Sequence, residues 1–177
     1  MRVTLTIALS GLLATSPAYA ATLDIAIEVP RLDVAEYHRP YIAVWLEGAD
    51  QNVAATLSVW YQQSGSSEGH GSKWLPDLRQ WWRKSGRTLA LPVDGVTGPT
   101  RPAGTHALSF DAGSPALKAL APGSYTLVVE AVREVGGREL LKLPFTWPAT
   151  TARSTSAQGT TELGTVTLSI KKGDGGN

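Results

Sequence analysis

Hydrophobic and polar residues alternate one by one in several short segments, which is the pattern of a β-strand with one buried face. The clearest case is the range 124–132, where Tyr125, Leu127, Val129 and Ala131 fall on one side. Turns rich in Gly and Pro separate these segments. The expected strands are 21–29, 41–47, 53–61, 105–110, 124–132, 140–145 and 163–171.

Three further stretches lie between these expected strands. The short polar link at 48–50 predicts that the strands 41–47 and 53–61 form an antiparallel hairpin. The range 88–92 predicts one more short strand. The range 150–161 consists mostly of Thr, Ser and Ala and indicates a mobile loop.

Between residues 74 and 83 the spacing changes to that of a helix. The apolar positions of this segment are Trp74, Leu78, Trp81 and Trp82. We expect Trp74 and Trp81 to pack against the sheet, although Trp rings can also stack on a flat ligand. Trp82 is expected to be the most exposed of the three. Together with Arg79 and Arg83 on the polar face, Trp82 forms a candidate binding surface.

These elements predict a mainly β fold, an antiparallel immunoglobulin-like β-sandwich with one short Trp-rich helix. A closed barrel is the competing architecture. A length of 177 residues favours one domain, which we expect over residues 21–172. The polar, Gly-rich range 173–177 is expected to be a disordered tail.

Residues 1–20 have the pattern of a secretory signal peptide. Arg2 supplies the positive charge, a short apolar run follows, and Ala18-Tyr19-Ala20 has the form of a cleavage site. A transmembrane anchor would need about 20 apolar residues, and this run is shorter. We therefore expect a protein that is exported to the periplasm, begins near Ala21 and does not itself span a membrane.

Composition narrows the range of activities. Without Arg2 the chain has 15 basic and 15 acidic residues, which gives no sign of a nucleic-acid partner. It has no Cys, so a thiol nucleophile is excluded. The three His residues lack the spacing of a helical metal pair, so no metal site is predicted. No catalytic constellation is evident, and the sequence favours a carrier or binding protein over an enzyme.

The densest turn signal is the range 94–104, with three Gly and two Pro in eleven residues. The segment 96–105, which contains the run Thr97-Gly98-Pro99-Thr100, resembles the predicted periplasmic proteins of domain-of-unknown-function family 2271, as do the segments 39–45, 73–83 and 122–131. The resemblance covers roughly residues 23–145. It implies no established enzymatic activity. The partners it implies are membrane-bound PepSY-type reductases and periplasmic flavin transferases.

Part of this loop is also similar to the acceptor pattern of flavin transferases, Asp-x-x-Ser/Thr-Gly-Ala-Ser/Thr, which attach FMN to the last hydroxyl. The matching residues are Asp94, Thr97, Gly98 and Thr100, with Pro99 where Ala is usual. Thr100 would carry FMN, and Arg101 could pair with its phosphate. A simple Pro/Gly turn, in which Asp94 caps the backbone, explains the same residues without a cofactor.

Three functional hypotheses follow from these observations. The first is an electron carrier or accessory protein of a membrane flavin system, with FMN on Thr100. The second is a non-catalytic periplasmic binding or interaction module without a cofactor. The third is a carbohydrate-binding sandwich that uses exposed Trp side chains as a platform.

Overall fold

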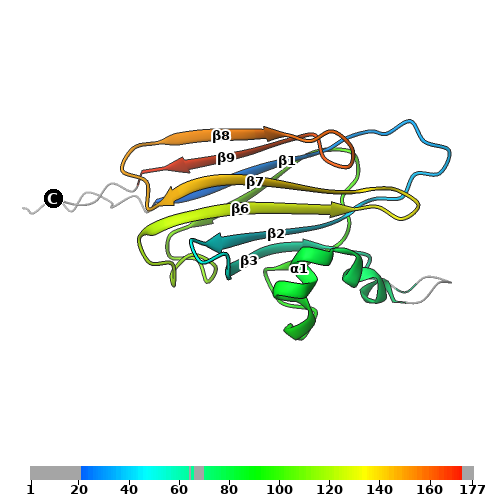
Figure 1. The fold of residues 1–177 in the computed structure, drawn as a ribbon, viewed down its shortest axis with the longest axis horizontal. Coiled ribbons are helices and arrows are strands. Elements are labelled where there is room, and N and C mark those ends of the chain that lie inside the picture. Colours follow the sequence, from blue (N-terminus) through cyan, green and yellow to red (C-terminus); the bar gives the residue numbers. More distant parts are fainter. Residues whose placement is uncertain (1–20, 64, 66–69, 173–177) are drawn as a thin grey trace, which may run out of the picture.

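The computed structural model describes residues 21–63, 65 and 70–172 of the chain (Figure 1). The expected signal peptide (1–20) and tail (173–177) lie outside these residues. The strands are β1 (Thr22–Val29), β2 (Tyr41–Gly48), β3 (Val53–Trp60), β4 (Thr97–Gly98), β5 (Gly104–Asp111), β6 (Gly123–Val132), β7 (Arg138–Trp147), β8 (Arg153–Gln158) and β9 (Thr165–Lys171). The helices are η1 (Gly71–Asp77), α1 (Arg79–Lys84) and η2 (Gly86–Thr88).

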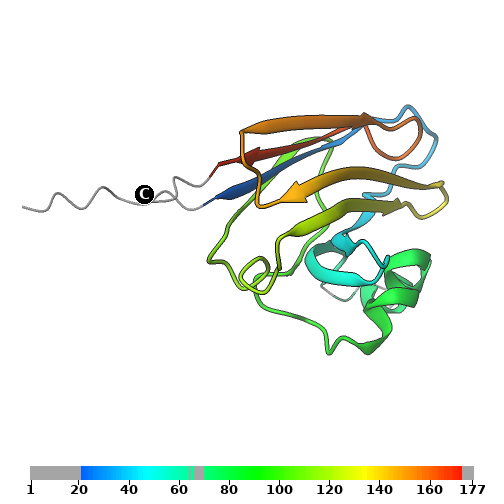
Figure 2. The same cartoon turned by 60° about the vertical axis from the view of Figure 1, so that its left-hand side comes forward.

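The strands form two sheets that face each other, which confirms the mainly β sandwich with few helices (Figure 2). One sheet has the order β5-β1-β9-β8 and the other the order β4-β3-β2-β6-β7. They do not close into a barrel. The β2–β3 hairpin is confirmed, and all pairings are antiparallel except the two-residue parallel pairing of β4 with β3.

Two expectations about the strands are wrong. The range 88–92 is not a strand but belongs to the end of η2 and the loop after it. The range 150–161 contains β8, which pairs with β9 along its whole length. Its polar residues gave no strand signal because β8 is an edge strand, where little side-chain burial is needed.

The main hydrophobic core lies between the two sheets and follows the alternation seen in the sequence. In β1, Leu23, Ile25, Ile27 and Val29 are all buried, and the residues between them are half-buried. The facing sheet contributes the second layer of this core. Its buried hydrophobic residues are Ile42, Val44, Leu46, Leu57, Trp60, Leu127, Val129, Ala131, Leu143 and Trp147.

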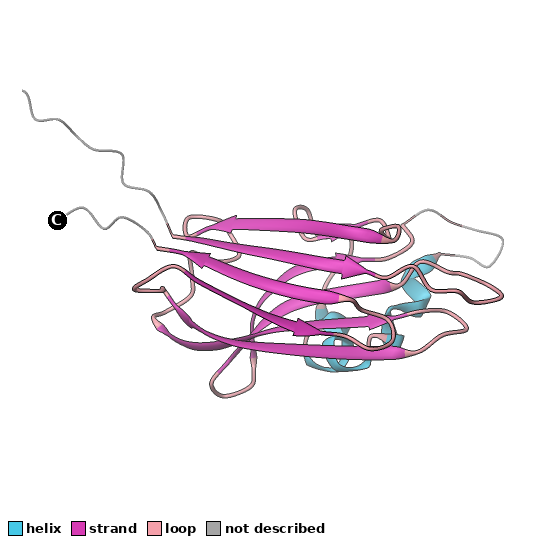
Figure 3. Ribbon diagram, turned by 90° about the horizontal axis from the view of Figure 1, so that it is seen from above, coloured by secondary structure: helices cyan, strands magenta, loops and turns pink. Residues whose placement is uncertain are grey.

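A second hydrophobic core covers the outer face of the five-stranded sheet. Residues 71–88, which we call the helical cap, lie over this face (Figure 3). Trp45 and Val59 of the sheet contact Trp81 and its neighbours in the cap. Because β2 is covered on both faces, its residues 42–47 are all buried and its sequence does not alternate.

The helical cap differs from the single helix that the sequence predicts. A 3-10 turn is followed by α1, so the buried residues Leu75, Leu78 and Trp81 lie three apart. This is the period of a 3-10 helix and not of an α-helix. The expectation that Trp74 is buried is therefore wrong: its side chain is 42% exposed, whereas Trp82 is partly buried.

Candidate functional site

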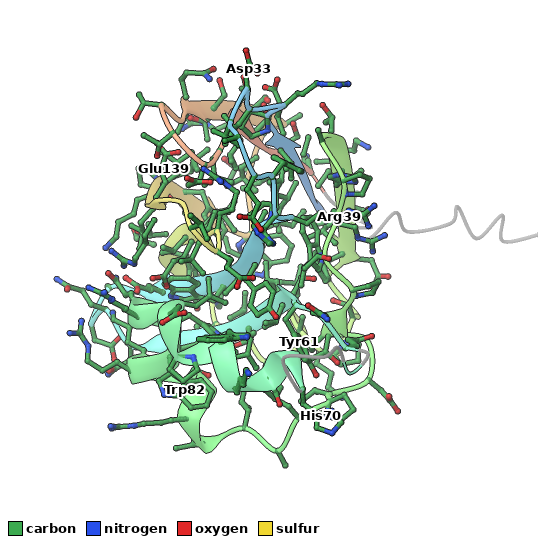
Figure 4. The ribbon with its side chains drawn as sticks, turned by 90° about the vertical axis from the view of Figure 1, so that its right-hand side faces the viewer. Asp33, Arg39, Tyr61, His70, Trp82 and Glu139 are labelled. Atoms are coloured by element: carbon green, nitrogen blue, oxygen red, sulfur yellow. The ribbon has the colours of Figure 1, made fainter. Side chains whose placement is uncertain are left out.

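An open cavity of about 960 Å³ lies at one end of the sandwich. Five segments of the chain form its walls. They are the loop before β2, Gln62 after β3, the helical cap, the segment after β4 and the turn between β6 and β7. Figure 4 looks onto this end of the molecule and labels Arg39, a residue of the wall before β2.

Exposed hydrophobic side chains concentrate around this cavity. Tyr37, Trp74 and Val135 line it, with exposed fractions of 38%, 42% and 79%. The only other large hydrophobic residue that is exposed among the described residues is Val34, three positions before Tyr37. Exposed hydrophobic groups that cluster around a concave site commonly mark a binding surface.

The charged residues that line the same cavity are mostly basic, four arginines against Asp77 and Glu134. Arg39 and Arg79 contribute guanidinium groups, and neither forms an ion pair with a carboxylate in the part of the chain that the structure describes. Arg138 is different, because its Nε donates to Glu130 at 2.6 Å. Two lining arginines therefore remain available for an anionic ligand.

The wall from the β6–β7 turn is fixed by a buried ion pair. Arg133 Nε lies 2.8 Å from Glu162 Oε2, and both side chains are buried. Glu162 also accepts a hydrogen bond of 2.7 Å from the backbone N–H of Gly137. A charge-assisted pair that also holds the backbone keeps this turn in one conformation.

The wall from the helical cap is tied to β2 through the Tyr41 hydroxyl. Its Oη donates to the carbonyl of Gly71 at 3.2 Å. Burial raises the pKa of Tyr41, so its phenol stays protonated and keeps donating well above neutral pH.

The predicted acceptor residues in the loop 94–104 lie in different environments. Asp94 lies in an exposed turn, next to Gly95 with a φ of 72°. The Thr97 hydroxyl accepts from the Val93 N–H at 3.1 Å and donates to its carbonyl at 3.0 Å. Gly98 pairs with β3. Thr97 and Gly98 thus shape the turn itself, and Asp94 lies exposed within it.

Thr100 has a different environment, because it lines the cavity and is half-buried. Arg101 is not among the lining residues: its Cζ lies 5.5 Å from the centre of the Trp60 ring. The structure therefore brings Thr100 and Arg79 to one cavity. Arg83 and Trp82, on the next turn of α1, are outside its walls.

Sequence reasoning missed three of the residues that define the site. Tyr37 and Arg39 lie in an irregular loop, and Val135 lies in a tight turn with a φ of 54°. Tyr37 and Val135 belong to no periodic pattern or motif, and Arg39 stands in the segment 39–45, where only the family resemblance singles it out. The sequence does place hydrophobic residues in these loop and turn segments. Such residues also occur in ordinary loops, so composition alone does not mark them as a site.

The arrangement suits a planar aromatic molecule that carries a negative charge. Aromatic rings of Tyr37 and Trp74 can stack on such a ligand. The guanidinium groups of Arg39 and Arg79 can pair with a phosphate or carboxylate. The Thr100 hydroxyl offers a hydrogen-bonding group or a point of attachment.

A family model described as "Predicted periplasmic protein (DUF2271)" matches residues 22–165. Neither the curated proteins nor the solved structures contain a match to the chain. Among the described residues, no helix is long and apolar enough to cross a bilayer.

Proposed function

The chain belongs to the DUF2271 family of predicted periplasmic proteins, and we propose that it serves a membrane flavin-dependent redox system as an electron carrier with FMN on Thr100. Its periplasmic localisation follows from the family. The flavin, the electron transfer and the partners are the proposal. Those partners are a periplasmic flavin transferase and a membrane-bound PepSY-type reductase.

One observation carries this proposal: Thr100 shares a cavity with exposed aromatic rings and with two arginines that have no carboxylate partner among the described residues. FMN combines a flat ring system with a phosphate, and these residues fit both parts. Arg39 and Arg79 would hold the phosphate, a role that the sequence analysis gave to Arg101. Trp74 and Tyr37 would face the ring.

The attachment would make one bond and break another. The Thr100 oxygen would form a phosphoester with the FMN phosphorus of a flavin adenine dinucleotide, which the transferase supplies. Adenosine monophosphate would leave, and the hydroxyl proton would be released. Once attached, the flavin would supply reversible electron transfer, while this chain would position it and shield one side from water.

Pro99 is compatible with the local backbone. A proline favours an extended conformation of the residue before it. Gly98 already has this conformation, since it pairs with β3 as part of β4. The substitution of Pro for Ala in the acceptor pattern therefore requires no change in the fold, and it bears only on recognition by the transferase.

The experiment is intact mass and visible absorbance of the mature protein after periplasmic co-expression with its cognate flavin transferase. The expected result is one FMN phosphoester on the wild type and none on Thr100→Ala. Thr105→Ala, which removes an exposed hydroxyl in β5, is the matched control and should be modified. An unmodified wild-type mass, with the transferase active on another substrate, would overturn the proposal.

The second candidate is a binding module without a cofactor, and the exposed hydrophobic residues around the cavity favour it. Tyr37, Trp74 and Val135 could contact a partner protein as directly as a flavin. In that case the wild type would stay unmodified, and Trp74→Ser would weaken partner capture without affecting the mass.

A further inference from the structure

We propose that the helical cap is a docking surface for a membrane of anionic phospholipids. The proposal does not depend on the flavin. It rests on the distribution of charge over the molecule, on the exposure of the cationic side chains and on the Trp residues that accompany them.

Charge is divided unequally between the helical cap and the rest of the chain. Residues 71–88 contain five basic residues and one acidic residue. The remaining residues from 21 onward contain ten basic and fourteen acidic residues. A chain with no net charge is thus positive at the cap and negative elsewhere, which would orient the cap towards an anionic surface.

Three arginines of the cap are available to a partner. Arg79, Arg83 and Arg87 are exposed, and none forms an ion pair within the described residues. Lys84 is engaged within the fold, because its Nζ lies 2.8 Å from the buried carboxylate of Glu47. The three arginines of this segment therefore face solvent.

Two Trp side chains accompany this charge. Trp74 is exposed, and Lys73 Nζ lies 4.7 Å from the centre of its ring. Trp82 is partly buried, and Figure 4 shows it on the opposite side of the cap from His70. Trp is favoured at the headgroup level of membranes, and basic residues beside it are typical of segments that lie on a bilayer.

A membrane fits these features better than an acidic protein. The three arginines are spread along a stretch of nine residues and do not converge on one pocket. A specific protein partner would require a surface of complementary shape. A lipid surface requires only charge and groups that suit its interface. Because Trp74 and Arg79 also line the cavity, docking through the cap would hold the cavity close to the membrane.

The test is flotation of the mature protein with vesicles of phosphatidylglycerol and phosphatidylcholine, and with vesicles of phosphatidylcholine alone. The wild type should bind the anionic vesicles, and binding should weaken as salt is added. Each basic residue near an anionic membrane surface contributes about 1 kcal/mol to the free energy of binding. The double variant Arg83→Gln with Arg87→Gln should therefore weaken vesicle binding about 25-fold.

The matched control replaces two exposed basic residues outside the cap that form no ion pair within the described residues, Lys118→Gln with Lys172→Gln, and should weaken binding much less. Arg83 and Arg87 do not line the cavity, so their replacement should leave modification of Thr100 unchanged. Failure to bind anionic vesicles, equal binding to neutral vesicles or equal losses in both double variants would each overturn the membrane proposal. An acidic protein that binds while vesicles do not would identify the cap as a protein interface instead.

Discussion

At the scale of single residues, carboxylates hold the loops of this protein. The clearest case is Glu139 of β7, which accepts hydrogen bonds from four successive backbone N–H groups before β9. Their donor–acceptor distances run from 2.6 to 3.1 Å, and the donors are residues 160–163. Burial opposes ionisation of Glu139, but these bonds outweigh it and lower its pKa to about 2.

This pKa predicts a specific dependence of stability on pH. Because the carboxylate is favoured in the folded state, its contribution is complete above about pH 4.5 and is lost as the pH falls towards 2. Glu139→Gln should reduce the free energy of unfolding by about 2 kcal/mol at pH 7. The difference from the wild type should shrink between pH 4.5 and 2 in denaturant titrations.

The control for this prediction is Glu36→Gln, since the Glu36 side chain is 68% exposed. It should change stability by less than about 0.5 kcal/mol. If Glu139→Gln lowered the free energy of unfolding by the same amount at every pH in this range, the charge of Glu139 would not be the cause of the loss.

At the scale of elements, a buried glutamate joins the helical cap to the sheet. Glu130 of β6 has no exposed side-chain surface and accepts from the backbone N–H groups of Gln80 and Trp81, at 3.0 and 2.8 Å. These donors belong to the first turn of α1, where they have no partner within the helix. The cap is therefore held by this carboxylate and by the packing of Trp81.

Glu130→Gln should loosen the cap more than the sandwich. The amide can accept one of these hydrogen bonds but leaves Arg138 without its carboxylate, and we expect a loss of about 2 kcal/mol. Hydrogen exchange should accelerate in α1 and remain slow in β1 and β9. Uniform acceleration in both regions would instead mean that cap and sandwich unfold together. Glu134→Gln, in an exposed turn, is the control.

The elements also show which parts of the fold the sequence could predict. β1 was predictable because burial on one face imposes alternation. β6 was also predicted from its alternating residues, although both of its faces are covered and its residues 127–131 are all buried. β8 was not, since its pairing depends on β9 and its side chains carry no signal. The exposure of Trp74 was not predictable either, because the change from a 3-10 turn to an α-helix at Leu78 shifts the buried face by one residue.

At the scale of the whole molecule, the edge formed by β7 and β8 stays open between the sheets. A cavity of about 1020 Å³ runs along it. Arg153 and Thr155 of β8 pair with Ile170 and Leu168, which face the core, so these polar residues point to the inside of the sandwich. Inward-pointing charges on an edge strand discourage pairing with another molecule.

Replacing the inward-pointing polar residues of β8 should cause the protein molecules to associate with one another. The double variant Arg153→Val and Thr155→Val would give β8 an apolar inner face beside an open groove. We expect the average mass measured by light scattering to rise with protein concentration, while the wild type is unaffected. Ser154→Val with Ser156→Val, on the outer face of the same strand, is the control. Equal association of both pairs would indicate a general effect of hydrophobicity.

The candidate site was predictable only in part, and the reason also lies at this scale. Thr100 and Arg79 were found because each belongs to a local pattern. Tyr37 and Arg39 meet them only through the sandwich, which brings five separate segments to one end. Contacts between segments that are distant in sequence leave no pattern within a short stretch of the sequence.

The pairing of Thr22 with Lys171 has a mechanical consequence. β1 and β9 are antiparallel neighbours, so the described chain begins and ends at the same corner of one sheet. A force applied to these two ends would load the first hydrogen bonds of the pair and then the next, since the bonds lie across the strands. The strands would separate like a zipper rather than slide past each other under shear. The domain should therefore yield at a low pulling force even though its core makes it stable at rest.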